Sequence, residues 1–247
     1  MSNLYNRLAK VYEAMYQSFI DYEQEYQFYN KILTAYRINN VLEIGCGTGN
    51  LASYFIRNKM GYCGLDISEP MLAIAQKKNP KGKFIQGDMR HLKVNSPLES
   101  IIVTGRTLNY LVEDTEVTSA FHSFFNSLMD KGILCFDFID ADEFIPAIRE
   151  NSNVIHEAIY DNTTYKRIST WNLRLKNGWD LDWRSDYYKK NANSWVKIGS
   201  DQANVRTFTL NEIDDFLKMS GFHLKDSVKR DTYAFSTYVV VAEKVTN

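Results

Sequence analysis

The chain has 247 residues, of which 45% are hydrophobic and 24% charged, and its formal net charge is −1. This length suits one large domain or a domain with an insertion, and the composition is that of a globular protein. A nearly neutral chain has no overall attraction to nucleic acid or to an anionic membrane. No apolar run approaches the roughly 18 residues of a membrane-spanning helix, and the first residues lack the apolar region of a secretory signal.

The cysteines and histidines argue against two kinds of site. Cys46, Cys63 and Cys135 are odd in number and lie in apolar contexts, so we expect reduced thiols in a cytoplasmic protein. The histidines are scattered and no Cys-x-x-Cys pair occurs. We therefore expect no metal site.

Helical and strand patterns alternate through the first part of the chain. Residues 4–36 carry apolar and tyrosine side chains at helical spacing, with a break near 18–21, which predicts two helices. The following alternation favours a parallel sheet with helices on both faces. We expect strands at 41–44, 62–66, 84–86, 100–104 and 133–139, and helices at 51–59, 69–78 and 117–129.

The turn after the first of these strands is rich in glycine. Gly45, Gly47 and Gly49 form Gly-x-Gly-x-Gly, and Glu43 lies two residues before the first glycine. Glycines let a ligand approach the backbone, and the start of the next helix offers free N–H groups. A dinucleotide site needs Gly-x-Gly-x-x-Gly. Its third glycine is replaced by Asn50, which disfavours an NAD-dependent enzyme.

Further polar residues follow the later strands. Asp66 ends the second expected strand, where a carboxylate can accept hydrogen bonds from both hydroxyls of a ribose. Asp88 and Met89 follow the third strand, where a carboxylate and an apolar side chain can bind the amino group and the face of an adenine. The fourth strand leads into residues 104–111. Ligands of open α/β sheets bind at this edge, outside the carboxyl ends of the strands.

The pattern changes after about residue 150. Residues 179–187 alternate strictly between apolar and polar side chains, which predicts a half-buried antiparallel strand. Residues 165–175 and 195–198 are similar, with turn signals at 177–178 and 191–193. Trp171, Trp179, Trp183 and Trp195 indicate a small second core or a dimer face, and the lining of a substrate pocket is the other interpretation.

The α/β pattern then resumes. We expect a helix at 210–219 that ends at Gly221, and a final antiparallel strand pair at 222–228 and 233–244. The predicted fold is a Rossmann-like, seven-stranded and mostly parallel sheet with helices on both faces, plus an antiparallel β insertion. The expected parts are an N-terminal helical lid (1–38), the Rossmann-like core (39–149 and 207–247) and the insertion (150–206), which would roof an acceptor site or form the face of a homodimer.

These segments resemble the successive motifs of the class I S-adenosylmethionine (SAM) dependent methyltransferases. The resemblance spans nearly the whole chain. Residues 108–111, the N-terminal tyrosines and the insertion are similar to small-molecule members, such as amino-sugar N-methyltransferases and glycine N-methyltransferase-like enzymes. The motifs lie at residues 41–51, 64–68, 87–89 and 130–134, the last of which lacks the proline of the usual Leu-x-Pro-Gly-Gly turn.

The resemblance implies SAM as the cofactor and methyl transfer to a nitrogen or oxygen of a small-molecule acceptor, with neither nucleic acid nor a membrane as partner. Tyr12 would belong to the lid that closes over the cofactor. The remaining cofactor contacts carry over by position: Glu43, Gly45, Cys46, Gly47 and Gly49 around the methionine moiety, Asp66 and Ile67 at the ribose, Asp88 and Met89 at the adenine.

Methyl transfer is an in-line displacement on an activated sulfonium. Positioning and water exclusion can therefore supply roughly 7–11 kcal/mol of the barrier reduction. A general base is needed only where the acceptor is protonated at neutral pH. The candidates are Tyr110, His91 and Tyr12, and the sequence does not decide among them. Arg106 is a candidate for binding a carboxylate or phosphate of the acceptor, and we interpret His122 as structural.

Four other functions compete with this one. Thr104-Gly105-Arg106 contains no acid, which argues against a metal-dependent O-methyltransferase. The same segment lacks the Asn/Asp-Pro-Pro-Tyr/Phe motif of adenine-specific nucleic-acid methyltransferases. An RNA (tRNA) methyltransferase and a non-catalytic SAM-binding protein stay open as alternatives, although the neutral charge weighs against RNA.

Overall fold

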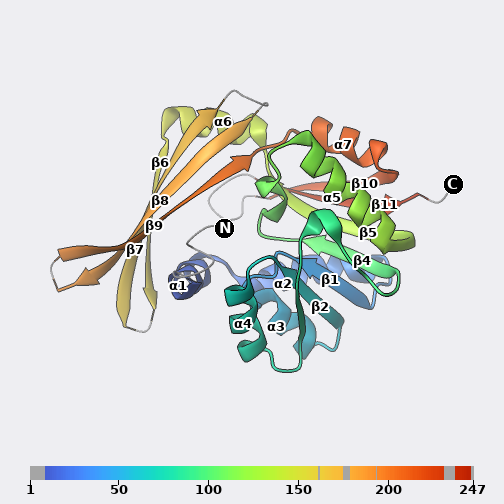
Figure 1. The fold of residues 1–247 in the computed structure, drawn as a ribbon, viewed down its shortest axis with the longest axis horizontal. Helices are drawn as coiled ribbons and strands as arrows, with labels where there is room; N and C mark the ends of the chain where they lie inside the picture. Colours follow the sequence, from blue (N-terminus) through green and yellow to red (C-terminus); the bar gives the residue numbers. More distant parts are fainter. Residues whose placement is uncertain (1–8, 161, 175–178, 193, 231–236, 246–247) are drawn as a thin grey trace.

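The computed structural model describes residues 9–160, 162–174, 179–192, 194–230 and 237–245, except for the side chains of residues 9, 10, 12, 14 and 19. Figure 1 shows the ribbon. The helices are α1 (Ala9–Phe19), α2 (Tyr22–Ala35), α3 (Asn50–Arg57), α4 (Glu69–Lys78), α5 (Asp114–Ser127), α6 (Ala141–Glu150) and α7 (Leu210–Met219), with short 3-10 helices η2 (Met89–His91) and η3 (Thr107–Tyr110).

The strands form two sheets (Figure 1). The first has seven strands in the order β10-β11-β5-β4-β1-β2-β3, and the second has four in the order β6-β7-β8-β9. The predicted fold class is confirmed, because the first sheet is parallel except at β11 and β10 and the second is antiparallel throughout. The strands are β1 (Asn40–Ile44), β2 (Gly61–Asp66), β3 (Lys83–Gln86), β4 (Leu98–Val103), β5 (Leu128–Ile139), β6 (Asn153–Tyr160), β7 (Thr163–Arg174), β8 (Asp180–Asn191), β9 (Ser194–Arg206), β10 (Phe222–Arg230) and β11 (Thr237–Lys244).

The seven-stranded sheet carries a hydrophobic core on each face. On one face, Phe121 and Phe124 of α5 pack with Phe216 of α7. On the other, Leu33 of α2 packs with Phe55 of α3. The central strands β1, β4 and β5 are buried on both faces, which explains their nearly continuous apolar sequences. This packing fixes the strand ends from which the candidate site is built.

The start of β5 differs from the prediction. The helix expected to reach Met129 ends at Ser127, and the turn expected at 130–132 lies within β5. The strand is irregular there, because its register against β4 shifts between Leu98 and Ser100 and Lys131 has a φ of 60°. A bulge of this kind accommodates the Asp-Lys-Gly segment without ending the strand.

Two elements at the start of the insertion and just before it were not predicted from the sequence. One is the helix α6, which has Pro146 in its interior, a residue that usually ends a helical pattern. The other is the edge strand β6, whose Ile155 and Ile159 are exposed and so obscure the usual alternation. The strands β7, β8 and β9 extend beyond the predicted segments. The turn signals at 177–178 and at Asn193 lie outside the described residues.

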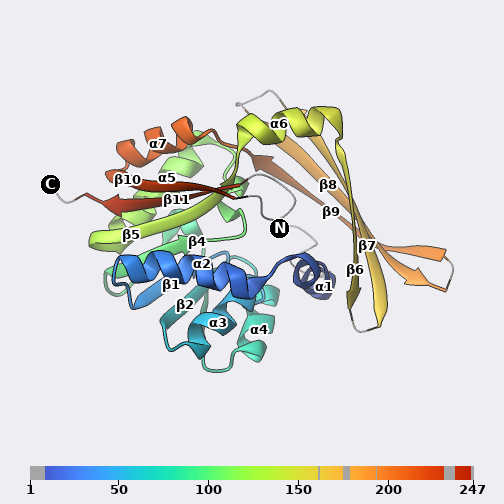
Figure 2. The ribbon, with the colours of Figure 1, turned by 180° about the vertical axis from the view of Figure 1, so that it is seen from behind.

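A third core joins the inserted sheet to two helices (Figure 2). Met15 of α1 and Phe144 of α6 pack with Trp171, Trp183 and Tyr187 of the sheet. The N-terminal helix thus packs on the inserted sheet, while α2 packs on the seven-stranded one. The break between the two helices lies where it was expected. Asp21 begins α2 by accepting hydrogen bonds from the backbone N–H groups of residues 23 and 24.

Candidate functional site

The glycine-rich turn joins β1 to α3 in a conformation that requires glycine. Gly45, Gly47 and Gly49 have φ values of 76°, 52° and 73°. A Cβ atom at Gly45 would lie 2.0 Å from the Oγ1 atom of Thr107, so the turn packs directly against η3. All three positions therefore favour glycine by their backbone conformation, and Gly45 also needs the absence of a side chain. The backbone of the turn is bare toward the edge of the sheet.

Asp66 at the end of β2 holds this turn in place. Its Oδ2 atom accepts a hydrogen bond of 2.9 Å from the N–H of Gly47, and its Oδ1 atom accepts one of 2.8 Å from the N–H of Ser68. Burial raises the pKa of the carboxyl, and the backbone hydrogen bonds oppose that rise. Asp66 and the exposed Ile67 line a large cavity of about 960 Å³.

Asp88 lines the same cavity after β3, but it has a strong partner. Arg90 donates to both carboxylate oxygens, from Nε at 3.0 Å to each, and also pairs with Glu116 of α5. These hydrogen bonds hold the pKa of Asp88 below its usual range. Arg90 was not predicted as a site residue, although it lies only two residues after Asp88. Met89, between them, is buried at the cavity wall.

Two buried carboxyl groups, those of Glu43 and Asp137, accept hydrogen bonds near the ends of the strands. Glu43 of β1 is 2% exposed and accepts hydrogen bonds from the hydroxyls of Thr104 and Tyr62, yet burial raises its pKa to about 7. Asp137 of β5 accepts hydrogen bonds from the N–H groups of Gly105 and Arg106 at 3.1 and 2.7 Å, and burial raises its pKa to about 7 as well. Together they fix the loop after β4.

A second, smaller cavity of about 130 Å³ adjoins the first. Both cavities are lined by Gly45, Gly47, Gly105 and Tyr110, so they meet at the glycine-rich turn and the loop after β4. Glu43 and Cys46 line only the smaller one. Within the described part of the chain, Gly49 lines neither cavity. It shapes the turn, and its carbonyl accepts a hydrogen bond from Asn79.

The candidate catalytic residues are placed unequally. Tyr110 lies where the two cavities meet, and Arg106 lines the smaller one. His91 is exposed in η2 and lines neither cavity. His122 is exposed on α5. The side chain of Tyr12 lies outside the described part of the structure. Tyr110 is therefore the candidate that the geometry supports.

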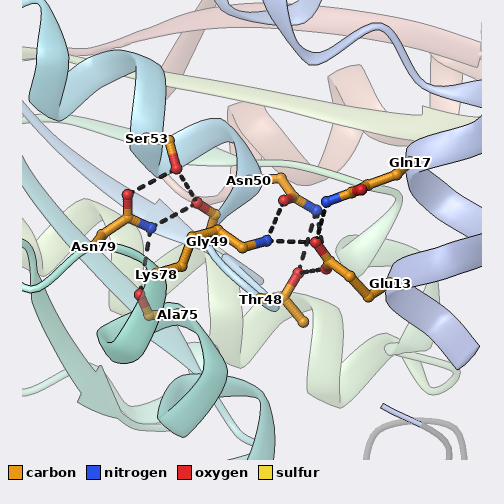
Figure 3. A network of polar contacts seen from close by, with 9 residues as sticks. All are labelled: Glu13, Gln17, Thr48, Gly49, Asn50, Ser53, Ala75, Lys78 and Asn79. Carbon is orange, nitrogen blue, oxygen red and sulfur yellow. Dashed lines mark hydrogen bonds and ion pairs between the residues drawn. The ribbon is translucent and has the colours of Figure 1, made fainter. Parts of the chain in front are cut away.

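The N-terminal helix reaches the turn through Glu13, which follows Tyr12 and to which the sequence assigned no role. Figure 3 shows Glu13 of α1, which is buried and pairs with Lys78 of α4. The same carboxylate accepts hydrogen bonds from the hydroxyl of Thr48 and, at 3.2 Å, from the amide of Asn50. One side chain thus links α1, the glycine-rich turn and α4. Only the tertiary structure brings these residues together.

The inserted sheet forms the far wall of the smaller cavity. Trp171 and Trp183 belong to the core under the insertion and also line the cavity. Trp179 packs against that core, and Trp195 lies 4.0 Å from the ammonium of Lys166. His156 and Arg167 line the cavity from β6 and β7 and were not predicted. A prediction of the β6–β7 hairpin would have placed these two residues opposite each other.

Two classes of feature are absent within the described part of the chain. No group of three or more His, Cys, Asp or Glu side chains is arranged to hold a metal ion. No helix there is long and apolar enough to cross a membrane.

Known proteins share this fold and parts of this sequence. CalS10, a SAM-bound amino pentose methyltransferase from Micromonospora echinaspora, superposes with a TM-score of 0.79 at 20% identity, covering 95% of this chain and 97% of that chain. The dTDP-3-amino-3,4,6-trideoxy-alpha-D-glucopyranose N,N-dimethyltransferase of Streptomyces venezuelae is 29% identical over 96 residues, which are 39% of this chain and 40% of that relative. The chain spans about half or less of the length of several curated methyltransferases that it matches.

Two further matches settle the family. Residues 41–132, which include the glycine-rich turn and both strand-end aspartates, match a family model described as a methyltransferase domain. An uncharacterized methyltransferase of Bacillus mycoides (strain KBAB4) is 30% identical over 149 residues, covering 58% of this chain and 69% of that relative. The chain therefore belongs to the class I SAM-dependent methyltransferases.

Proposed function

We propose that this protein transfers the methyl group of SAM to the amino nitrogen of a small sugar. The observation that carries the proposal is the meeting of two cavities at Gly45, Gly47, Gly105 and Tyr110. One cavity holds the carboxylates suited to a nucleoside, and the other has an aromatic and charged wall. The acceptor class follows the relatives, since the Streptomyces enzyme and CalS10 both act on amino sugars by name.

The residues present fit SAM as the cofactor. Asp66 accepts backbone hydrogen bonds from Gly47 at Oδ2 and from Ser68 at Oδ1, and a carboxylate has about four acceptor sites, so it can also accept from ribose hydroxyls. The bare backbone of the glycine-rich turn leaves room for the methionine moiety near Glu43 and Cys46. Bound SAM would supply a methyl group on an activated sulfonium. Ile67 would pack on the ribose from the exposed side of β2.

Asp88 and Met89 would hold the adenine. A carboxylate already fixed by Arg90 is well oriented, because its oxygens cannot rotate away from the cavity. The adenine amino group would then share Asp88 with the guanidinium. Met89 offers an apolar, polarizable surface for the ring face.

Tyr110 and the N-terminal helix would complete the site. Tyr110 lies at the junction of the cavities, where its hydroxyl can orient the acceptor nitrogen. Tyr16 and Tyr22 line the smaller cavity beside the turn, so α1 and α2 exclude water there. Residues 1–38 would act as a lid that Glu13 holds against the turn. Positioning and water exclusion of this kind can supply roughly 7–11 kcal/mol.

The experiment is a turnover assay with matched acceptors. We expect S-adenosylhomocysteine to form with a nucleotide-linked amino sugar and not with the same sugar carrying a hydroxyl in place of the amine. Transfer RNA is the third acceptor, and activity with RNA alone would overturn the proposal. Tyr110→Phe should slow turnover while leaving S-adenosylhomocysteine affinity within twofold, because only the acceptor contact changes.

A further inference from the structure

The edge of the inserted sheet faces the larger cavity. β9 is the last strand in the order β6-β7-β8-β9, so one side of it pairs with β8 and no described strand lies along the other. Residues 200–204 of β9 line the larger cavity, as do Asp66 and Asp88. An unpaired strand edge presents a row of backbone N–H and C=O groups. The larger cavity thus has a second polar wall besides the strand ends of the seven-stranded sheet.

The hydrogen bonds at the end of β9 fix which of its backbone groups point out of the sheet. The N–H of Thr207 donates to the carbonyl of Trp179, directly beyond the paired residues of β8 and β9. Hydrogen-bonded and non-hydrogen-bonded pairs alternate along an antiparallel ladder. The register is continuous from that end, so Gln202 and Asn204 fall in non-hydrogen-bonded pairs. Their backbone N–H and C=O groups therefore point away from β8.

A contact with η3 supports this orientation. Arg206 belongs to the same outward-facing set, and its carbonyl accepts a hydrogen bond of 2.5 Å from the side-chain amide of Asn109. Asn109 is 1% exposed and precedes Tyr110 in the chain, so η3 closes the edge of β9 at residue 206. Within the described part of the chain, no backbone hydrogen bond from a loop or turn reaches residues 202 and 204. The edge is therefore open where it lines the cavity.

The open segment of the edge is uncharged. It consists of Gln202, Ala203 and Asn204, and both amide residues are exposed. Charged groups of both signs line the cavity beside it, among them Arg184 and Asp186 of β8. Side-chain amides and edge backbone groups both donate and accept hydrogen bonds. Such a wall suits the hydroxyl groups of a neutral ligand better than it suits an ion of either sign.

The two cavities differ in what they can hold. A protein cavity of about 150 Å³ binds one benzene molecule. The smaller cavity, of about 130 Å³, therefore has room for one group of about that size. In the proposed function this group is the methionine moiety of SAM, near Glu43 and Cys46, which line the smaller cavity only. A sugar ring then needs the larger cavity, which measures about 960 Å³.

We propose that the sugar of the methyl acceptor lies in the larger cavity between Tyr110 and β9. Its hydroxyl groups are hydrogen-bonded to the edge backbone and the side-chain amides of Gln202 and Asn204. This inference rests on the proposed function, since it locates the acceptor of that reaction. The amine lies at the junction near Tyr110, and the hydroxyl groups lie along the edge of β9. Gln202 and Asn204 position the sugar and take no part in the methyl transfer itself.

The first test separates the side chain of residue 202 from its backbone. Gln202→Leu removes the amide and keeps the backbone N–H, whereas Gln202→Pro removes both. Each lost neutral hydrogen bond should raise KM for a nucleotide-linked amino sugar about 2- to 12-fold, so the proline variant should show the larger rise. Turnover at saturation and affinity for S-adenosylhomocysteine should stay within twofold. An unchanged KM in both variants would overturn the proposal, and equal rises would contradict the backbone contact.

A second proline variant keeps this test independent of folding. The N–H of Ala203 belongs to a hydrogen-bonded pair with β8, because its neighbours point outward. Proline is tolerated at an edge only where its missing N–H faces away from the ladder. Ala203→Pro should therefore lower the urea midpoint further than Gln202→Pro does. Equal midpoints would show that residue 202 does not point its N–H out of the sheet, and the proposal would fail.

A matched pair of asparagines tests the side-chain contact. Asn172 of β7 and Asn204 of β9 lie opposite the same residue of β8, so they share one face of the sheet. Of these two described residues, Asn204 lines the larger cavity and Asn172 lines neither cavity. Asn204→Ala should raise KM for the amino sugar about 2- to 12-fold, and Asn172→Ala should leave it unchanged. A comparable rise in Asn172→Ala would contradict the proposal.

Analogues of the acceptor that lack one hydroxyl test the inference on the unmutated protein. At least one analogue should have a raised KM, and that rise should disappear in Gln202→Leu or in Asn204→Ala. A rise that persists in both variants would contradict the assignment. If no amino sugar is methylated, the proposed function fails. Calorimetric binding of the nucleotide-linked amino sugar to the S-adenosylhomocysteine complex should then still weaken in Gln202→Pro and not in Asn172→Ala. Absent binding, or equal binding by both variants, would overturn this inference too.

Discussion

The two sheets contribute to the candidate site in different ways. The seven-stranded sheet supplies backbone geometry: a turn of glycines at positive φ, whose Gly47 N–H donates to Asp66, and a loop after β4 whose N–H groups donate to Asp137. The inserted sheet supplies side chains that project from strand faces, among them Trp171 and Arg167. A backbone site depends on the whole fold, whereas strand-face side chains can change without altering the fold. In the proposed function, the SAM-binding side at the seven-stranded sheet is therefore constrained by the fold, and the methyl-acceptor side at the inserted sheet is free to specialise.

The largest expected effect is on stability, from a substitution in the glycine-rich turn of the seven-stranded sheet. Gly45→Ala would place a Cβ atom 2.0 Å from the Oγ1 atom of Thr107, at a φ of 76°. Left-handed strain and overpacking together should lower the free energy of unfolding by about 2–5 kcal/mol. Gly105→Ala is the matched control, because its φ is 66° but a Cβ atom there would meet open space. Urea unfolding should show a loss of only about 1–2 kcal/mol for the control.

Equal losses for Gly45→Ala and Gly105→Ala would show that the contact with η3 contributes nothing. In that case only the φ requirement would explain the glycine at position 45.

The two sheets should also respond to pH in opposite directions. The folded-state pKa of Glu43 is raised to about 7, so between pH 4.5 and 7 the native state binds more protons than the unfolded state. Stability then falls as pH rises through that window, by roughly 3 kcal/mol for this group. The folded-state pKa of His156 is lowered to about 4. Between pH 6.5 and 4 the unfolded state binds the extra proton, and stability falls as pH falls.

Two variants separate these contributions. Glu43→Gln should reduce the loss of stability on going from pH 5 to pH 7 and leave the part that is due to Asp137, whose pKa is also raised to about 7. His156→Gln should reduce the loss on going from pH 6 to pH 4. The effect at His156 should be smaller than 3 kcal/mol, because its side chain is only partly buried. Urea unfolding across the pH range checks both. The same slope in wild type and Glu43→Gln would show that Glu43 is not the group responsible.

The sequence predicted the candidate site residues of the seven-stranded sheet better than those of the inserted sheet, for a physical reason. The glycines, Asp66 and Asp88 are marked by local patterns, a strand followed by a turn, and parallel strands bring their ends to one edge. The pairing of His156 with Arg167 depends on the register of two strands, one of which has exposed isoleucines that hide its alternation. The four tryptophans were visible, but which of them would line a cavity depended on tertiary packing.

Contacts between residues that are far apart in the sequence were also not predicted. Glu13 and Lys78 are 65 positions apart; Glu13 follows Tyr12 in the N-terminal motif but was given no role, and Lys78 belongs to no motif. The helix α6 was not predicted because Pro146 lies in its interior. Its buried side chains nevertheless pack against the inserted sheet and stabilise the helix. Tertiary contacts override local preference in such segments.

Asp66→Ala is the next test of the SAM-binding side. Loss of charge-assisted hydrogen bonds to the ribose should cost roughly 1.5–3 kcal/mol, or about 10- to 150-fold in affinity for S-adenosylhomocysteine by calorimetry. Trp183→Phe is the control from the inserted sheet and should leave that affinity within twofold. Unchanged affinity in Asp66→Ala would contradict the ribose assignment. A comparable loss in Trp183→Phe would show that the two sheets do not divide the site as described.

The smallest expected effect concerns the helix that joins the two regions. Met15 fixes α1 to the inserted sheet, and Glu13 links it to Lys78 beside the glycine-rich turn. The side chains of Glu13 and Lys78 are 7% and 29% exposed. A double-mutant cycle of Glu13→Gln and Lys78→Met should therefore give a coupling energy of about 1 kcal/mol. The exposed pair Asp214 and Lys218 on α7 is the control and should give about 0.3–0.5 kcal/mol.

Hydrogen exchange gives this last comparison its structural meaning. If Glu13 holds α1 against the turn, Glu13→Gln should speed exchange in α1 while exchange in β7 and β8 stays unchanged, because Met15 still packs on the inserted sheet. The Asp214→Asn control should leave exchange in α1 unaltered. If α1 and the inserted sheet exchanged faster together, they would open as one unit. The lid would then comprise the whole insertion, and the boundary between the two regions would lie at the turn itself.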